Sequence, residues 1–253
     1  MKSVQSIHWD LSELHDSTSV DTATPRIDDI EQRANEFSDQ YKGRVSNLTA
    51  SEIHSALKNY ELIRSDLYQI SQFAHLNYSV DIQDAEILKF VSLIDERASK
   101  ISNILLFFFL EVGQVPKETL DHWCDDFINE PYRYVLVQAV DKNQYRLTEK
   151  EEQLINLKDL TGIDALRKMY GEHTSRYEFK LTVDGQEKVM NGSECRALRY
   201  HDDPNVRRDA MQLFFERYQT DEHIMVHLFN SIIKDYNIER IHRGYDAPIS
   251  GMN

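Results

Sequence analysis

Glycine and cysteine are both scarce in this chain, and their scarcity excludes several kinds of site. The 253 residues include eight glycines and two cysteines, Cys124 and Cys195. The glycines are dispersed, so the sequence contains none of the glycine-rich motifs that bind phosphates or dinucleotides, and no GxSxG turn for a nucleophilic serine. The cysteines lack the CxxC spacing of redox and metal sites, and two alone do not form a disulfide framework.

Positive charge and long hydrophobic runs are also lacking. The chain has 29 Lys and Arg against 43 Asp and Glu, a formal net charge of −14. Because nucleic-acid binding requires a basic face for the phosphates, neither DNA nor RNA is expected as a partner. The strongest apolar run, residues 104–110, is far too short to cross a bilayer, and no signal peptide is visible at the N-terminus. The sequence therefore predicts a cytoplasmic protein that does not bind a membrane.

The dominant feature of the sequence is an apolar stripe between residues 84 and 112. Its residues are spaced alternately four and three apart, which places them on one face of an α-helix. A matching stripe lies between residues 49 and 78, and residues 79–83 form a short polar connection. Two long helices joined by a short turn pack antiparallel, so we expect a long helical hairpin over 49–112. The stripes consist of Ile53, Leu57, Tyr60, Ile63, Leu67, Ile70 and Ala74, and of Ile87, Val91, Ile94, Ala98, Ile101, Leu105, Phe108 and Val112.

The hairpin is preceded by one further helix. We expect that helix to begin at Pro25, because proline suits the first helical position, and to end at Gly43. Residues 17–25 have no apolar period and are expected to form a connector. The hairpin itself should open with a capping box, Thr49 and Glu52. Upstream of the connector, Trp9, Leu11 and Leu14 are expected to form a short apolar cluster.

Smaller helices are predicted over residues 116–175. The first begins at Pro116, includes Leu120, Trp123 and Phe127, and ends by Pro131. Residues 131–140 favour another helix, although their valines leave a strand open. A second capping box, Thr148 and Glu151, opens a helix that Gly162 closes, and a last short helix follows it.

The C-terminal third combines one β-hairpin with further helices. Asp184-Gly185 separates two stretches of alternating apolar and polar residues, which predicts a β-hairpin near 177–190. Helices resume at Ser193, at Asp203 as an N-cap, and over 220–242. The fold class is therefore predominantly all-α, with a long antiparallel helical hairpin, a helical bundle and one small β-hairpin. The last helix is expected to bury Met225, Leu228, Phe229, Ile232 and Tyr236.

Candidate catalytic and metal-binding residues are few. His223 and His227 share a helix face at the i, i+4 spacing of zinc ligands, but Ile224 stands where an HExxH peptidase has its glutamate base. We interpret the pair as solvent-exposed. Glu239 and His242 form a single Glu-x-x-His, whereas a di-iron bundle needs two. The acidic doublets Asp125-Asp126, Glu151-Glu152 and Asp202-Asp203 are interpreted as helix caps or surface charge. No catalytic or metal-binding residue is assigned, and substrate-binding residues stay unassigned.

The order of several short segments resembles the N-terminal part of the oligoendopeptidase F family, relatives of thimet oligopeptidase. These segments are WDLSEL at 9–14, FSDQYKGRV at 37–45, YRLTEKEEQLINLKDLTG at 145–162, VDG at 183–185, DDPNVRRDAM at 202–211 and RGYD at 243–246. The resemblance implies a mostly helical, two-lobed zinc peptidase that cleaves short peptides inside a channel with a metal-activated water.

The same resemblance implies how the chain is organised. Residues 1–175 would form the helical N-terminal lobe, and residues 176–253 the start of a catalytic lobe that stops before the HExxH zinc site. The partner would be the missing C-terminal catalytic portion of the same protein, and zinc the cofactor of the full-length enzyme. Residues 1–253 alone would bind no metal, cleave no peptide and expose an apolar patch around Ile238 and Ile241. The alternative is a helical scaffold or interaction protein without enzymatic activity.

Overall fold

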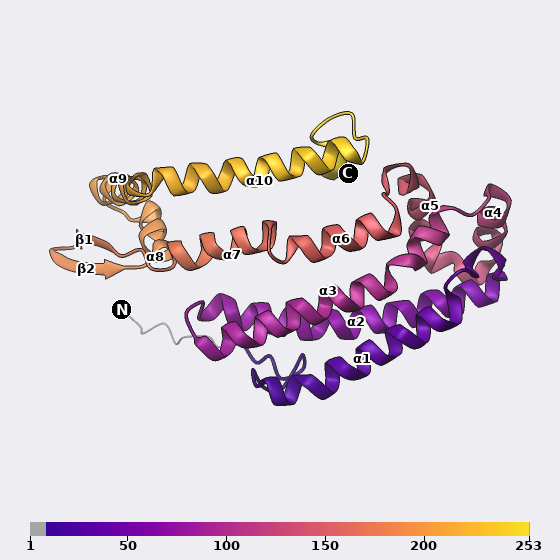
Figure 1. Cartoon of the computed structure of the whole chain (residues 1–253). Helices are drawn as coiled ribbons and strands as arrows, with labels where there is room; N and C mark the ends of the chain where they lie inside the picture. The colour runs from indigo at the N-terminus through magenta and orange to yellow at the C-terminus, as the bar shows by residue number, and fades with distance from the viewer. Residues whose placement is uncertain (1–8, 253) are drawn as a thin grey trace. The chain divides into compact units, whose positions relative to one another are not determined.

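The computed structural model describes residues 9–252, except for the side chains of residues 127, 128 and 252. Helices dominate this part of the chain, and one two-stranded antiparallel sheet accompanies them (Figure 1). The predicted all-α class with one small β-hairpin is confirmed. The chain divides into two compact units, Met1–Lys158 and Asp159–Asn253. The predicted boundary of a catalytic lobe near residue 175 stays a prediction.

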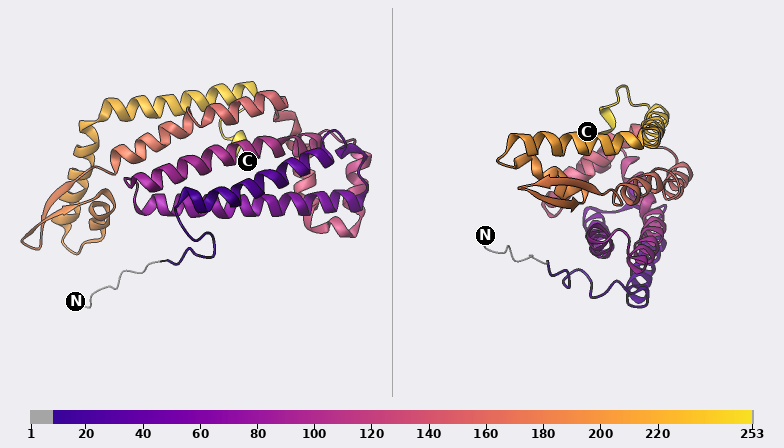
Figure 2. Two further views of the ribbon diagram at one scale, coloured as in Figure 1. Left: turned by 60° about the horizontal axis from the view of Figure 1, so that its bottom comes forward. Right: turned by 90° about the vertical axis from the view of Figure 1, so that its left-hand side faces the viewer.

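Three long helices form the body of the first unit. They are α1 (Val20–Tyr41), α2 (Ala50–Val80) and α3 (Ala85–Gly113), which lie side by side in both views (Figures 1 and 2). The predicted helical hairpin is confirmed. The Thr49–Glu52 capping box is present at the start of α2, and the Asp84 side chain caps α3. Both stripes lie in or against the core, and their fully buried members include Ile53, Ile63, Ile70, Ala74, Ile94, Ile101, Phe108 and Val112.

Helix α1 begins at Val20, so the predicted start at Pro25 is wrong. The Ser19 hydroxyl accepts a hydrogen bond from the Asp21 amide at 3.3 Å and caps the helix earlier. Pro25 therefore lies inside α1, where a proline typically costs about 3 kcal/mol because it removes one helical hydrogen bond. Ala23 is fully buried and extends the apolar stripe toward the N-terminus. Burial of the Ala23 side chain offsets part of the cost of the proline.

The residues before α1 pack only in part. Leu11 and Leu14 lie against the core, but Trp9 is 81% exposed, so the predicted cluster is wrong for Trp9. The Leu14 amide donates to the Leu11 carbonyl, and the Arg26 guanidinium donates to the Leu14 carbonyl. These bonds hold the turn that contains both leucines, and Trp9 lies outside that turn.

Shorter helices complete the first unit. They are α4 (Lys117–Asp125), α5 (Arg133–Asp141) and α6 (Glu149–Asp159). The α5 helix excludes the strand alternative, and the Thr148–Glu151 capping box is confirmed by the Thr148 amide, which donates to Glu151 Oε2 at 2.9 Å. A 3-10 helix, Phe127–Tyr132, follows α4, so α4 ends earlier than predicted. The packing predicted for Phe127 lies outside the described side chains.

The second unit contains the sheet. After α7 (Ile163–Thr174), strands β1 (Phe179–Val183) and β2 (Gln186–Met190) pair antiparallel, with Phe179 opposite Met190. Asp184 and Gly185 both have positive φ angles, 53° and 77°, which two-residue hairpin turns of type I′ require. The predicted β-hairpin is therefore confirmed. The hairpin packs into a hydrophobic core of the second unit, whose buried residues are Tyr177, Phe179, Met190, Cys195 and Ala210.

Among the described residues, three α-helices follow the sheet: α8 (Gly192–Ala197), α9 (Pro204–Thr220) and α10 (Glu222–His242). Asp203 caps α9 as predicted. Along α10, Leu228 is buried and Met225 packs against the core of the unit, but Phe229 is 64% exposed. The prediction that Phe229 faces inward is wrong, because apolar residues are distributed around more than one face of α10 and the core lies on the face of Leu228.

Across residues 9–252, no single helix is long and apolar enough to cross a membrane. Helices α3 and α4 together are long and apolar enough, but the chain bends by 99° between them.

Candidate functional site

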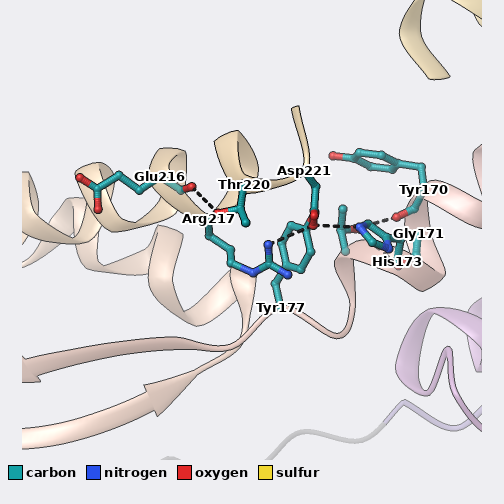
Figure 3. A network of polar contacts seen from close by, with 9 residues as sticks. Tyr170, Gly171, His173, Tyr177, Glu216, Arg217, Thr220 and Asp221 are labelled. Carbon is teal, nitrogen blue, oxygen red and sulfur yellow. Dashed lines mark hydrogen bonds and ion pairs between the residues drawn. The ribbon is translucent and has the colours of Figure 1, made fainter. Parts of the chain in front are cut away.

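A cluster of polar side chains surrounds Asp221 in the second unit (Figure 3). Three groups reach one carboxylate oxygen, Asp221 Oδ2. The Tyr177 hydroxyl donates to it at 2.7 Å, the Arg217 guanidinium donates to it at 3.0 Å, and His173 Nε2 lies 2.9 Å away. The Arg217 guanidinium also lies over the Tyr177 ring, 3.6 Å from its centroid, in a cation–π contact.

Each member of the cluster comes from a different place in the fold. His173 lies in the last turn of α7, and Tyr177 precedes β1. Arg217 lies in the last turn of α9, four residues before Asp221, a spacing that brings two side chains together on one face. Asp221 itself ends α9 and precedes α10. One carboxylate thus joins the end of α7, the start of the sheet and the α9–α10 junction.

The hydrogen bonds shift the pKa values of Asp221 and Tyr177 in opposite directions. The Tyr177 hydroxyl above all, then His173 and Arg217, lower the pKa of Asp221 to about 2, because each bond stabilises the carboxylate. Burial and the neighbouring Asp221 raise the pKa of Tyr177. Asp221 is therefore charged and Tyr177 protonated near neutral pH.

This arrangement is suited to holding the unit together. A general base needs a pKa near the working pH, whereas the Asp221 carboxylate has a far lower one and three partners on one oxygen. A His–Asp pair can also orient a nucleophile, as in a catalytic triad. Both cysteine thiols are buried, and burial raises the pKa of Cys124 and of Cys195, which disfavours the nucleophilic thiolate. The Asp221 cluster is best described as a structural polar junction.

The histidines singled out in the sequence lie elsewhere. His223 and His227 are both exposed on α10. Within the described residues, no group of three or more His, Cys, Asp or Glu side chains is arranged to hold a metal ion. Glu239 pairs with Arg243 at 2.6 Å, and His242 is exposed.

The acidic doublets serve local structure where their contacts are seen. Glu151 completes a capping box, and Glu152 Oε1 accepts from the Leu147 amide at 3.1 Å. Asp203 Oδ1 accepts from the Asn205 amide at 2.8 Å. The predicted capping role is therefore confirmed for Glu151 and Asp203.

Sequence reasoning missed the Asp221 cluster. Its one local signal is the i, i+4 pair of Arg217 and Asp221, which is common on helix surfaces. The other two members, His173 and Tyr177, lie more than forty residues earlier, at separations of 48 and 44 residues from Asp221. Only the packing of α7 and the sheet against α9 and α10 brings them to the carboxylate.

Known proteins provide a further comparison. The family model described as Oligopeptidase F matches residues 111–179. An oligoendopeptidase F homologue from Borreliella burgdorferi is 22% identical over 228 residues, which cover 90% of this chain and 37% of that protein. The crystal structure of oligoendopeptidase F from Enterococcus faecium aligns with a TM-score of 0.77 at 17% identity, covering 91% of this chain and 44% of that one.

A second crystal structure, from Chlamydophila abortus, aligns with a TM-score of 0.56 at 14% identity, over 96% of this chain and 41% of that one. At these identities the two structures show a shared fold. The chain spans less than half the length of the relatives that it matches. Family model, relative and fold agree, and they confirm that this chain resembles the N-terminal portion of the oligoendopeptidase F family.

Proposed function

We propose that residues 1–253 are the N-terminal portion of a zinc-dependent oligopeptidase that hydrolyses short peptides. The observation that best supports this proposal is the fold alignment with oligoendopeptidase F of E. faecium, which covers 91% of this chain but only 44% of that protein. In the proposed enzyme, this portion supplies the scaffold and part of the wall of a substrate channel. Catalysis is assigned to residues outside this chain.

The residues that the structure describes do not fit a zinc site. The two exposed histidines of α10, His223 and His227, have no third ligand near them among the described residues, and Ile224 replaces the glutamate of an HExxH motif. A catalytic zinc site in proteins uses three protein ligands and one open position. We therefore place the zinc ligands of the proposed enzyme outside residues 1–253 and expect this portion alone to be inactive.

A scaffold role agrees with the ion pairs that connect the long helices of the first unit. Glu31 on α1 accepts from two cations of α3, Arg97 at 2.9 Å and Lys100 at 2.5 Å. Arg33 on α1 pairs with Asp66 on α2 at 2.6 Å. The buried stripes hold the three long helices together, and these partly exposed pairs connect the polar faces of α1, α2 and α3. A channel wall that admits peptides by size requires such rigidity.

The proposal is tested by comparing two proteins on one fluorogenic peptide. One is residues 1–253, and the other is the same chain extended through the sequence that follows in its gene. We expect cleavage only by the extended protein, and we expect a chelator to abolish it. Replacement of the glutamate in the newly included HExxH should abolish it as well, because that residue acts as the base on the zinc-bound water.

The competing function is a helical scaffold or interaction protein without enzymatic activity. One observation suits it: the side chains of Val226 and Phe229 on α10 are 50% and 64% exposed, and exposed apolar residues that lie together mark interaction surfaces. An extended protein without metal-dependent cleavage, or a gene without an HExxH downstream, would leave the scaffold function in place of the peptidase.

A further inference from the structure

Helix α10 is the last long helix in Figure 1, and its sequence has apolar residues on two faces. The inner stripe includes Leu228, which is 3% exposed, and Met225, which packs against the core of the second unit. The outer stripe consists of Val226, Phe229 and Ile233, spaced three and four residues apart and therefore on one face of the helix. These three side chains are 50%, 64% and 43% exposed.

The outer stripe is unusual for a surface helix. A helix at a protein surface normally has one apolar face toward the core and polar residues opposite, whereas a helix that is apolar on several sides is normally buried. Further along α10, Ile238 and Ile241 are also 50% and 64% exposed. Asn230 and Lys234, which are also exposed on α10, are polar. The helix therefore has the composition of one that is covered on a second side.

We infer that the outer stripe of α10 is the docking face for the remainder of an oligoendopeptidase F-type polypeptide, the portion that this chain lacks relative to its relatives. This inference rests on the proposed function. The chain covers 37% of the B. burgdorferi homologue and 44% of the E. faecium protein, so most of each relative lies outside the aligned region. The additional length of the relatives therefore identifies a polypeptide segment that would cover the outer stripe.

The chemistry of the stripe suits such an occupant. An aromatic side chain, Phe229, lies between two β-branched aliphatic ones, Val226 and Ile233, and none of the three is charged. Permanent interfaces have this composition and resemble a domain core cut in half, with aromatic residues near the centre. A second copy of the chain is the alternative apolar partner, and cysteine labelling distinguishes the two partners.

Cysteine labelling tests the inference directly, because both native thiols are buried. Phe229→Cys places a thiol in the outer stripe, and Asp209→Cys places one at an exposed polar position of α9, away from the exposed isoleucines of α10. Each variant is prepared as residues 1–253 and as the gene-extended protein. Its alkylation rate with a bulky maleimide is measured after circular dichroism has verified the fold.

We expect Phe229→Cys to react at least ~10-fold more slowly in the extended protein than in residues 1–253, because a docked partner limits access to local opening events. Asp209→Cys should react at similar rates in both proteins. Equal rates for Phe229→Cys in the two proteins would overturn the inference. Protection of Phe229→Cys within residues 1–253 that disappears on dilution would also overturn it and assign the stripe to a second copy.

The same proteins separate this inference from the proposed function. An extended protein that protects Phe229→Cys but cleaves no peptide would contradict the peptidase and leave the docking face standing. An extended protein that cleaves peptides while Phe229→Cys stays reactive would contradict only the docking face.

Discussion

The Tyr177 hydroxyl donates a 2.7 Å hydrogen bond to Asp221 Oδ2 and thereby joins the start of the sheet to the α9–α10 junction. Tyr177 is almost fully buried, at 2% exposure. Loss of its partner would leave a buried hydroxyl without this acceptor, and an unsatisfied buried polar group destabilises a fold. The stability of the second unit should therefore depend on Asp221.

Asp221→Asn keeps one oxygen that can accept from Tyr177 but removes the negative charge that Arg217 and Tyr177 contact. It should lower the midpoint of urea unfolding of the second unit, and the loss should depend on pH. The pKa of Asp221 is about 2 in the folded chain, below its ordinary value of 3.8. A depressed pKa stabilises the fold fully above the unfolded value, and the contribution disappears as the pH falls through the folded value. The difference between wild type and Asp221→Asn should thus be constant above about pH 4 and shrink toward pH 2.

Asp209→Asn is the matched control for that substitution. Asp209 lies on the same helix and pairs with the adjacent Arg208 at 3.1 Å, but both side chains are largely exposed. Exposed ion pairs contribute little to stability. A pH-independent effect of Asp221→Asn, or an equal effect of Asp209→Asn, would show that the cluster does not hold the unit together.

A carboxylate in the α3 stripe should be far more damaging than one outside it. Leu105 is 1% exposed, so Leu105→Asp would bury an unpaired charge. Such a charge typically lowers the free energy of unfolding by about 4 kcal/mol or more. We expect loss of cooperative thermal unfolding. Lys100→Asp, although outward, is not a neutral control, because Lys100 pairs with Glu31. Ser92→Asp introduces the same group at an exposed position of α3 and should unfold like wild type.

Gly113 should not tolerate even a methyl group. A Cβ at this position would lie 2.8 Å from the Ala139 carbonyl oxygen and 2.9 Å from Asn143 Oδ1. Gly113→Ala should therefore force α3 and α5 apart and destabilise the first unit by about 1–3 kcal/mol. At Gly192 the nearest side-chain atom would be 3.7 Å away, an ordinary contact, so Gly192→Ala serves as the control. Equal urea midpoints for the two variants would contradict the close approach.

Purified residues 1–253 should not retain stoichiometric zinc after dialysis. Two exposed histidines without a third ligand make an incomplete tetrahedral site. Elemental analysis of the dialysed protein measures this. Tight retention that His227→Ala removes would instead reveal a zinc site within this chain.

The fold could be predicted where local chemistry decides it. The capping box of Thr49 and Glu52 and the Asp184-Gly185 turn each specify one backbone geometry, and the structure has both. The start of α1 could not be predicted in the same way, because proline fits the first helical position and Ser19 competes as an earlier cap. Here the buried Ala23 decides between two plausible starts.

Contacts between distant segments determine the other features that could not be predicted from the sequence. The inward face of α10 is ambiguous in the sequence because Val226, Phe229 and Ile233 on one face are as apolar as Met225, Leu228 and Ile232 on the next. The packing of the second unit buries Leu228 and leaves Phe229 exposed. The partners of Asp221 likewise come from α7 and the segment before β1, which no local pattern brings together.

The most direct test of the account is chelator-sensitive cleavage of one fluorogenic peptide by residues 1–253 and by the gene-extended protein, measured side by side. We predict no cleavage by residues 1–253 with or without added zinc, and cleavage by the extended protein that a chelator abolishes. Cleavage by residues 1–253 alone would contradict the scaffold role assigned to them. An extended protein without metal-dependent cleavage would contradict the peptidase itself.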